Sequence, residues 1–488
     1  MKKGQIMDGV VERVDFPNKG IIRTEEGMVT VKNTIPGQSI RFVISKKRSG
    51  RAEGRLLEIL EPSHLESRAP VCDLFPDCGG CTWQTMPYEE QLRLKADQVR
   101  RLLESKTEWS IFEGIHPSPK EFAYRNKMEF SFGDAYKDGP LCLGLHKRSS
   151  HYDVLTASGC QLVHPDMTAI LTAALSFFQE RRIPYYHKMT HEGILRHLLL
   201  RRSEKSGDLL ACLVTTGVLG EQDGLEDFET VLHRYAERLM SLNLEGRIVG
   251  ILHMRNDSVA DIVQSEETTI LYGQDYFYET LLGLRFKITP FSFFQTNSSG
   301  AEVLYSIARQ YVEERSIGQA PVIFDLYSGT GTIAQMLAPV AKKVIGVEIV
   351  EEAVEAARVN ARMNDLDNCT FLAGDVLKVL DTIPERPDFI VLDPPRDGVH
   401  PKALQKIIAY SAPCILYISC KPTSLARDLE VLLANGYREE RMCCVDMFPQ
   451  TTSVETIVLL SNRKIKPDSH VRLSLDMEDY YRFADQRK

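Results

Sequence analysis

The feature that most constrains the fold of this chain is a regular alternation of strand-like and helix-like segments that begins at residue 322. Apolar, β-branched runs recur at residues 322–327, 343–348, 370–375, 389–393 and 415–420. Runs of this kind, separated by helical lengths of chain, predict a doubly wound parallel sheet of the α/β class. Such sheets bind ligands outside the carboxyl ends of their strands. We therefore expect the functional residues of this region at those ends.

Five side chains able to contact a ligand fall at the predicted strand ends, namely Tyr327, Glu348, Asp375, Asp393 and Cys420. A single acidic residue at a strand end is most simply a solvent-exposed residue at the rim of the sheet, and a single cysteine is most simply a small core residue. Five such residues at one edge of a sheet favour a ligand site. Cys420 is the most informative of them, because it stands at the polar end of its strand, where a nucleophilic thiol would be accessible.

The turn after the first of these strands is rich in glycine. Gly329 and Gly331 let the backbone approach a ligand closely, but Ala334 stands where a dinucleotide fingerprint has its third glycine, and no P-loop lysine follows. Glu348 ends the second strand, where a carboxylate can accept hydrogen bonds from both ribose hydroxyls of NAD or of S-adenosylmethionine. The Pro-Pro pair at residues 394–395 favours S-adenosylmethionine, because it forms a stiff turn over the site.

Another group of cysteines lies nearer the N-terminus. Cys72, Cys78 and Cys81 have the spacing C-x5-C-x2-C, with two glycines between the last pair. A turn of this kind directs backbone amides at the sulfur atoms and is typical of a metal site. The fourth thiolate would come from Cys142 or Cys160, and we favour Cys160 because it follows a glycine in a loop-like segment. Zinc and an iron–sulfur cluster both suit four thiolates, and the spacing does not choose between them.

Length and composition indicate several domains. The chain has 488 residues, of which 43% are hydrophobic, so more than one core can form. Residues 1–62 contain short strands between turns, which is typical of a small OB-like β-barrel. Residues 63–290 mix strands and helices as a central α+β domain that would carry the metal site. Residues 291–462 form the α/β domain, and residues 463–488 a C-terminal tail.

Charge and hydropathy restrict the partners and the compartment. The net charge is -8, yet residues 1–60 hold 12 Lys and Arg against 7 Asp and Glu, so a basic N-terminal module would meet phosphates. We find no signal peptide and no apolar stretch of about 18 residues, and we expect a cytoplasmic monomer without a membrane span. In that compartment the 11 cysteines should not form a disulfide framework.

Longer motifs extend through the second half of the chain. They are Phe294-Gln-Thr-Asn297, Asp325-Leu-Tyr-Ser-Gly-Thr-Gly-Thr332, Leu392-Asp-Pro-Pro-Arg-Asp-Gly398, Ile418-Ser-Cys-Lys-Pro422 with Leu425-Ala-Arg-Asp428, and Phe448-Pro-Gln-Thr451 with Val454-Glu455. These motifs resemble those of the RNA 5-methyluridine methyltransferases. With the spaced cysteines they are similar to the branch that acts on uridines of 23S ribosomal RNA. Residues 1–62 resemble the TRAM domain, an OB-like RNA-binding barrel.

The resemblance implies a Rossmann-like methyltransferase domain and a set of residue roles. It implies that Cys420 is the nucleophile and Glu455 the base, and that the methyl donor is S-adenosylmethionine. The donor would contact Gln295, Tyr327, Glu348 and Asp393. The resemblance also implies a [4Fe–4S] cluster, with ligands Cys72, Cys78, Cys81 and Cys160. The partner would be 23S ribosomal RNA.

Covalent catalysis places a demand on the cysteine. A thiolate must form near neutral pH to add to carbon 6 of uracil, so we expect the pKa of Cys420 to lie below about 8.5. Lys421 and Arg396 are the cations expected to lower it, together with the sulfonium of the donor.

Other classes of protein stay open. The same reaction could take place on tRNA uridine, although the tRNA branch usually lacks the barrel and the cluster. A non-catalytic RNA-binding protein would keep the barrel but need neither Cys420 nor Glu455. A cytosine methyltransferase would place Pro-Cys beside the fourth strand, where this chain has Asp-Pro-Pro-Arg. An amino-group methyltransferase would need no cysteine.

Overall fold

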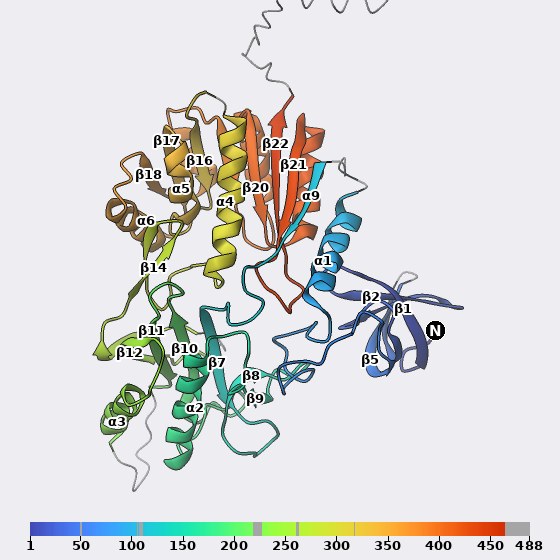
Figure 1. The fold of residues 1–488 in the computed structure, drawn as a ribbon, viewed down its shortest axis with the longest axis vertical. Coiled ribbons are helices and arrows are strands. Elements are labelled where there is room, and N and C mark those ends of the chain that lie inside the picture. The colour runs from blue at the N-terminus through green and yellow to red at the C-terminus, as the bar shows by residue number, and fades with distance from the viewer. Residues whose placement is uncertain are drawn as a thin grey trace, which may run out of the picture.

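The computed structural model describes residues 1–48, 51–104, 106, 111–217, 227–259, 263–316 and 318–463. These residues form a closed five-stranded barrel, a seven-stranded sheet, a two-stranded hairpin and an eight-stranded sheet (Figure 1). The eight-stranded sheet lies above the seven-stranded sheet in that view, and the barrel lies to one side. The predicted C-terminal tail lies outside the described residues from residue 464 onward. Within the described part of the chain, no helix has the length and apolar character that crossing a membrane requires.

The N-terminal barrel confirms the small β-barrel expected from the sequence. Its strands follow one another around the barrel in the order β1-β2-β3-β5-β4. Their bounds are β1 (Ile6–Asp15), β2 (Lys19–Thr24), β3 (Gly27–Lys32), β4 (Ser39–Arg48) and β5 (Arg51–Glu61). Alternate residues of these strands point inward and are buried, among them Ile22, Val31 and Phe42.

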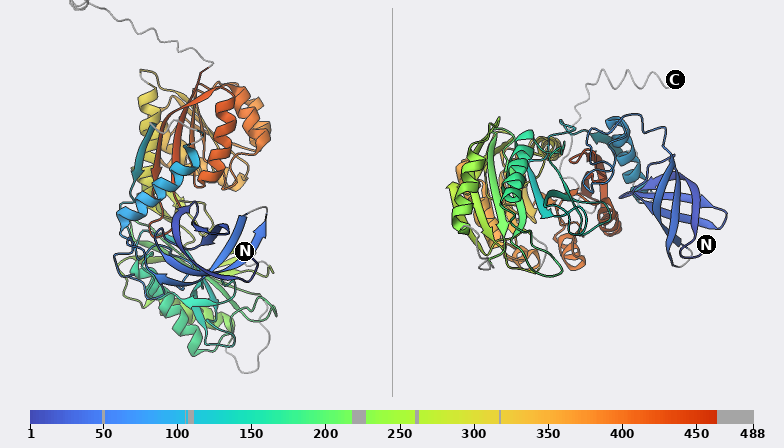
Figure 2. Two further views of the ribbon diagram at one scale, coloured as in Figure 1. Left: turned by 90° about the vertical axis from the view of Figure 1, so that its right-hand side faces the viewer. Right: turned by 90° about the horizontal axis from the view of Figure 1, so that it is seen from below.

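Helix α1 (Tyr88–Leu103) joins the barrel to the eight-stranded sheet. Leu94 packs into the barrel core, whereas Val99 and Leu103 pack into one of the hydrophobic clusters of the sheet. Arg101 donates a hydrogen bond of 2.6 Å to the carbonyl oxygen of Val14 in the barrel. The two faces of α1 therefore fix the barrel to the body of the molecule, and Figure 2 shows the helix between them.

The central sheet has the order β13-β12-β11-β10-β7-β8-β9. Its strands are β7 (Lys127–Gly133), β8 (Cys142–His146), β9 (Val154–Thr156), β10 (Leu195–Arg202), β11 (Asp208–Thr215), β12 (Arg247–Arg255) and β13 (Glu267–Gly273). Helices α2 (Pro165–Glu180) and α3 (Phe228–Met240) cover one face through a cluster of buried aliphatic and aromatic side chains. The hairpin of β14 (Phe277–Leu281) and β15 (Leu284–Ile288) leads from this sheet to the next and shares a hydrophobic core with both.

The C-terminal sheet has the order β18-β17-β16-β19-β20-β22-β21-β6. The strands are β6 (Phe112–His116), β16 (Val322–Leu326), β17 (Lys343–Glu348), β18 (Cys369–Ala373), β19 (Phe389–Leu392), β20 (Cys414–Ser419), β21 (Tyr437–Val445) and β22 (Glu455–Asn462). The α-helices around them are α4 (Ser298–Arg315), α5 (Thr332–Leu337), α6 (Glu351–Met363), α7 (Val376–Val379), α8 (Pro401–Tyr410) and α9 (Pro422–Ala434). Short 3-10 turns cover Ala338–Val340 and Leu380–Thr382.

Strands β16 to β20 are parallel, which confirms the doubly wound sheet predicted from the alternating pattern. Strand β22 runs antiparallel to both of its neighbours. One strand differs from expectation, because β6 comes from the segment expected in the central domain and pairs in parallel with β21. Its sequence Phe-Glu-Gly-Ile-His has no strand periodicity, so the pairing partner rather than local propensity decides its structure.

A buried ion pair joins α1 to the end of β21. The ammonium of Lys95 lies 2.7 Å from Oδ1 of Asp446, and both side chains are fully buried. The same ammonium donates to the carbonyl oxygen of Phe448 at 3.1 Å and lies 5.8 Å from the centre of the Trp83 ring. Burial lowers the pKa of Lys95, while Asp446 opposes that shift.

We predict that Lys95→Met lowers the free energy of unfolding by about 3–5 kcal/mol, because it leaves the Asp446 carboxylate buried without its cation. Denaturant unfolding measures the loss. Arg100→Met is the matched control on the same helix. Its partner is Glu104 at 3.5 Å, and both side chains are about half exposed, so the loss should stay below about 0.5 kcal/mol. Equal losses in the two variants would contradict this assignment of the pair.

Candidate active site and four-cysteine pocket

The candidate site lies along the carboxyl ends of four neighbouring strands. Tyr327 follows β16, Glu348 ends β17, Asp393 follows β19 and Cys420 follows β20. Glu455 begins β22, and because β22 is antiparallel to β20, its first residue lies at the same edge, with Ser419 opposite Thr456. The remaining acidic strand-end residue, Asp375, caps α7 through a 2.9 Å hydrogen bond from Leu377 N to its Oδ1.

The glycine turn and Glu348 are held together by backbone hydrogen bonds. Gly329 and Gly331 have φ angles of 53° and 74°, in the left-handed region that favours glycine. Gly329 N donates to Glu348 Oε2 at 3.0 Å, and Val350 N donates to Glu348 Oε1 at 3.0 Å. A Cβ atom on Gly331 would lie 2.6 Å from the Phe371 ring, so only glycine fits there. The Glu348 carboxylate is therefore held beside the turn without a ligand.

Two carboxyl groups at this edge, those of Asp393 and Asp325, have raised pKa values. Burial raises the pKa of Asp393 to about 7 and that of Asp325 to about 7, and the charge of Asp393 adds to the shift of Asp325. Oδ2 of Asp325 accepts from Ala334 N at 3.0 Å, whereas its buried Oδ1 has no hydrogen-bond partner among the described residues. Asp325 stands in the quoted Asp-Leu-Tyr motif, and a charged residue inside an apolar strand was the signal that could have identified it.

Cys420 lies within the electrostatic influence of Glu455 and Asp393. Burial, followed by the negative charges of Glu455 and Asp393, raises the pKa of the Cys420 thiol to about 11, and Arg396 opposes this. Burial and Asp393 raise the pKa of Glu455 to about 8, and Arg396 again opposes. The expectation of a pKa below about 8.5 for Cys420 is therefore wrong for the ligand-free site, because burial disfavours the thiolate and two carboxyl groups add to that effect. Lys421 pairs instead with Asp397 at 3.6 Å.

Gln295 is positioned by the central sheet. Asn126, just before β7, donates to the carbonyl oxygen of Gln295 at 3.0 Å and to the Ser298 hydroxyl at 2.8 Å. Tyr305 of α4 was not foreseen from the sequence. Burial raises its pKa, as do the charges of Asp393 and Glu455, while a hydrogen bond with the Gln295 side chain lowers it. No motif marks this tyrosine, which reaches the site through the packing of its helix.

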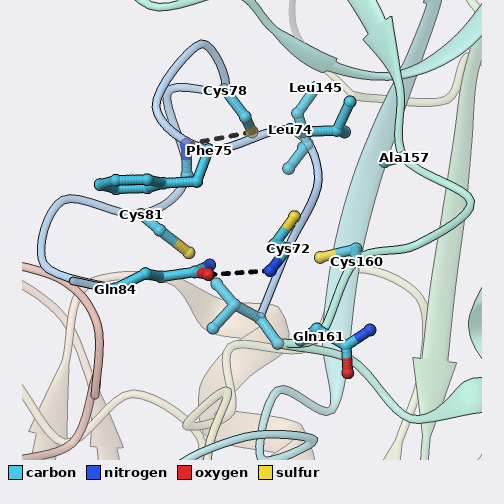
Figure 3. Close-up of a pocket in the computed structure, with 12 residues that line it drawn as sticks. Cys72, Leu74, Phe75, Cys78, Cys81, Gln84, Leu145, Ala157, Cys160 and Gln161 are labelled. Carbon is cyan, nitrogen blue, oxygen red and sulfur yellow. Dashed lines mark hydrogen bonds between the residues drawn. The ribbon is translucent and has the colours of Figure 1, made fainter. Parts of the chain in front are cut away.

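Cys72, Cys78, Cys81 and Cys160 line one pocket, together with Phe75, Leu145 and Ala157. Figure 3 shows the four sulfur atoms around this space. Gly80 N donates to Cys78 Sγ at 3.4 Å, so one of the amides expected to face a sulfur does so. Burial, followed among other causes by neighbouring thiolates, raises the pKa of Cys81 to about 12 and also raises that of Cys160.

The pocket leaves Cys142 out. Its Sγ lies 3.5 Å from the carbonyl oxygen of Pro140, and it is not among the residues that line the pocket. Across the described ranges, no three His, Cys, Asp or Glu side chains stand close enough together to hold a metal ion. The four thiols are therefore gathered around one space but are not drawn in to metal-binding distances.

Comparison with known proteins agrees with this architecture. Residues 247–463 match a family model described as tRNA (Uracil-5-)-methyltransferase. An uncharacterised RNA methyltransferase from Clostridium tetani is 46% identical over 466 residues, covering 95% of this chain and 99% of that protein. One from Caldanaerobacter subterraneus subsp. tengcongensis is 44% identical, with coverages of 94% and 99%.

A solved structure extends the likeness. The Pyrococcus abyssi tRNA (uracil-54, C5)-methyltransferase, in complex with S-adenosyl-L-homocysteine, superposes with a TM-score of 0.69 at 25% identity. The superposition covers 93% of this chain and 100% of that chain. The fold and the strand-end site define a methyltransferase that uses S-adenosylmethionine. The chain belongs to the RNA 5-methyluridine methyltransferase family, as the motifs indicated.

We predict that alkylation of Cys420 by iodoacetamide rises about tenfold per pH unit and levels off only near a pKa of about 11, because only the thiolate reacts. Peptide mapping by mass spectrometry follows this residue among the 11 cysteines.

The variant Glu455→Gln supplies the matched test of the cause. Above about pH 8, where Glu455 is ionised, the substitution removes a negative charge beside the thiolate. The pKa of Cys420 therefore falls, and alkylation at a fixed pH in that range becomes faster. A wild-type plateau already reached near pH 8.5 would contradict the raised pKa of the ligand-free site.

Proposed function

We propose that this chain transfers a methyl group from S-adenosylmethionine to carbon 5 of a uridine in 23S ribosomal RNA, through a covalent adduct between Cys420 and the base. The observation that carries the proposal is the placement of a thiol and a buried carboxyl, Cys420 and Glu455, at adjacent strand ends. A thiol and a carboxyl group at adjacent strand ends can supply the nucleophile and the base that the reaction needs.

The residues present fit the methyl donor. Gln295, Tyr327, Glu348 and Asp393 would hold S-adenosylmethionine, which supplies an electrophilic methyl group when bound. Glu348 is held in place by two backbone amides and can accept hydrogen bonds from the ribose hydroxyls. Asp325 has an unpartnered oxygen in the part of the chain that is described, and its pKa and that of Asp393 are raised to about 7, so both favour a cationic ligand.

The chemistry follows from the weakness of carbon 5 as a nucleophile. The thiolate of Cys420 adds to carbon 6, forming the C6–S bond and moving an electron pair toward carbon 5. Carbon 5 uses that electron pair to take the methyl group from the sulfonium, whose S–CH3 bond breaks to leave a neutral thioether, and carbon 5 then carries both the methyl group and its hydrogen. Glu455 removes this hydrogen as a proton. The electron pair left behind restores the C5–C6 double bond, and the C6–S bond breaks to release the thiolate.

The pKa of Glu455, raised to about 8, suits this role. A base whose pKa lies near the operating pH has enough basicity to take the proton and is still partly ionised at neutrality. The target base must leave its stack to reach Cys420, so we propose that it is flipped or unpaired when it binds. The barrel and the central sheet would hold the surrounding RNA, with exposed Lys46, Lys47 and Arg51 at one end of the barrel.

We also propose a [4Fe–4S] cluster on Cys72, Cys78, Cys81 and Cys160. The donor set fits, because four thiols line one pocket and a backbone amide faces one of them. Burial, and after it the neighbouring thiolates, raise the pKa of Cys81 and Cys160, so their charged forms need a cation between them. We assign the cluster a structural role, since methyl transfer moves no electrons overall.

A tRNA substrate is the second candidate, favoured by the Pyrococcus abyssi enzyme. That protein is a tRNA methyltransferase, and the part of this chain that its superposition leaves uncovered is shorter than the barrel. The barrel therefore does not argue against tRNA, contrary to what we expected from the sequence.

The adduct itself tests nucleophile, base and substrate. We predict that Glu455→Gln, incubated with S-adenosylmethionine and RNA, accumulates a protein–RNA adduct that survives a denaturing gel, because the proton on carbon 5 is not removed. Cys420→Ala in the same chain should abolish it. Transcripts of 23S ribosomal RNA and of tRNA, run in parallel, identify the substrate by which one is trapped. Wild-type methylation without an adduct in Glu455→Gln would transfer the role of base to another residue.

The choice of fourth metal ligand has its own test. We predict that Cys160→Ser lowers the iron and acid-labile sulfide bound per chain, whereas Cys142→Ser leaves both at the wild-type level. Chains purified without oxygen are analysed for iron, sulfide and zinc. Loss in Cys142→Ser alone would contradict the assignment of Cys160, and zinc without sulfide would replace the cluster by a zinc site.

A further inference from the structure

The loop between β21 and β22 leads directly to Glu455, and Gln450 lies at its centre. This glutamine is fully buried and has a φ of 68°, in the left-handed region that non-glycine residues rarely adopt. A residue in that conformation persists where its surroundings hold it. The contacts of Gln450 show what does so.

Every polar group of Gln450 is hydrogen-bonded. The amide N–H donates to Gln91 Oε1 at 2.9 Å, and Gln91 Nε2 donates back to Gln450 Oε1 at 3.0 Å. The carbonyl oxygen accepts from Thr82 N at 2.7 Å and from Trp83 N at 3.3 Å. The side-chain amide donates to Glu121 Oε1 at 2.9 Å. One residue therefore joins α1, the segment after Cys81 and the loop before Glu455.

A second route connects Gln450 to the wall of the four-cysteine pocket. Arg68 donates to Gln450 Oε1 at 3.2 Å and to the carbonyl oxygen of Gln84 at 2.9 Å. Gln84 lines the pocket, and its Oε1 accepts from Cys72 N at 3.1 Å, as Figure 3 shows. The chain of hydrogen bonds thus runs from Cys72 through two side chains to the loop.

The rest of the loop is held in the same way. Phe448 and Cys160 both pack against a small buried cluster of Cys81, Tyr124 and Leu162. The hydroxyl of Tyr124 donates to the carbonyl oxygen of Pro449 at 3.0 Å. The cysteine segment and the loop therefore share both packing and hydrogen bonds.

We propose that Gln450 is a positioning residue for Glu455, and that it transmits the order of the four-cysteine segment to the base. The proposal rests on the proposed role of Glu455. Gln450 contacts neither reacting atom. It fixes the path of the loop, and the loop fixes where β22 begins. Loss of its hydrogen bonds would displace the Glu455 carboxylate from carbon 5 while leaving Cys420, on the other strand, in place.

As a base, Glu455 acts only after the methyl group has been transferred, so its displacement has a specific signature. In Gln450→Leu we expect turnover to fall by about 10²-fold, the size of effect that a displacement of about 1 Å can produce. The covalent protein–RNA adduct should accumulate at the same time, because formation of the adduct needs the Cys420 thiolate but not the Glu455 carboxylate. KM for RNA and the metal content should stay at wild-type values.

Gln91→Leu is the second test variant, because it removes both hydrogen bonds of the Gln91–Gln450 pair while leaving Gln450 intact. Gln98→Leu is the matched control. It removes another buried amide of α1, one that makes no hydrogen bond within the described residues, and it should leave both turnover and adduct level unchanged.

The outcomes separate this proposal from the proposed base. Reduced turnover without adduct, in Gln450→Leu or Gln91→Leu, would mean a loss of folded enzyme and would overturn the positioning role. The same holds if Gln98→Leu behaves like the two test variants. Glu455→Gln, run alongside, reports on the base itself. If it forms no adduct while the wild type turns over, the base assignment fails first and the positioning role fails with it.

Discussion

The buried ion pair between Lys95 and Asp446 is the interaction on which the arrangement of the molecule depends. Taking both charges out of water is costly, and only close, well-directed contacts offset that cost, so the pair admits a single register between α1 and β21. Helix α1 packs against the barrel on one side and against the catalytic sheet on the other. Fixing its register therefore also fixes where the barrel stands relative to the strand ends. The same ammonium contacts the loop that leads to Glu455.

Several carboxyl groups lie close together at the candidate active-site edge. Asp325, Asp393 and Glu455 each have a pKa raised by burial, and the last two also suppress ionisation of Cys420. Such a cluster destabilises the ligand-free site, since every group would gain by moving into water. A cationic donor relieves that strain and favours the thiolate at the same time. Under the proposed function, the electrostatics that bind the donor would also activate the nucleophile, with no separate base needed to ionise it.

Local sequence predicted the parts of the site that lie on one strand each. The apolar runs predict the strands, and the point where each run stops predicts the carboxyl end of its strand. This reasoning placed Tyr327, Glu348, Asp393 and Cys420 at one edge of the sheet. Features that depend on contacts between distant segments of the chain could not be predicted from local sequence patterns. The pKa of Cys420 was misjudged because its two carboxyl neighbours come from other strands. Tyr305 arrives on a helix without a motif, and β6 has no strand pattern of its own and becomes a strand only beside β21.

Under the proposed function, the reaction and the choice of substrate depend on different parts of the chain. The chemistry needs only the edge formed by β16, β17, β19, β20 and β22, whereas RNA can contact the central sheet below that edge and the barrel to its side (Figure 1). A tRNA methyltransferase superposes on nearly the whole chain at 25% identity, so one backbone arrangement serves sequences that differ at most positions. Base contacts and phosphate contacts are made by side chains. Under the proposed function, substrate choice would therefore lie in the surface residues of the barrel and central sheet, while the buried contacts of Lys95 and Gln450 hold α1 against the sheet that carries Cys420.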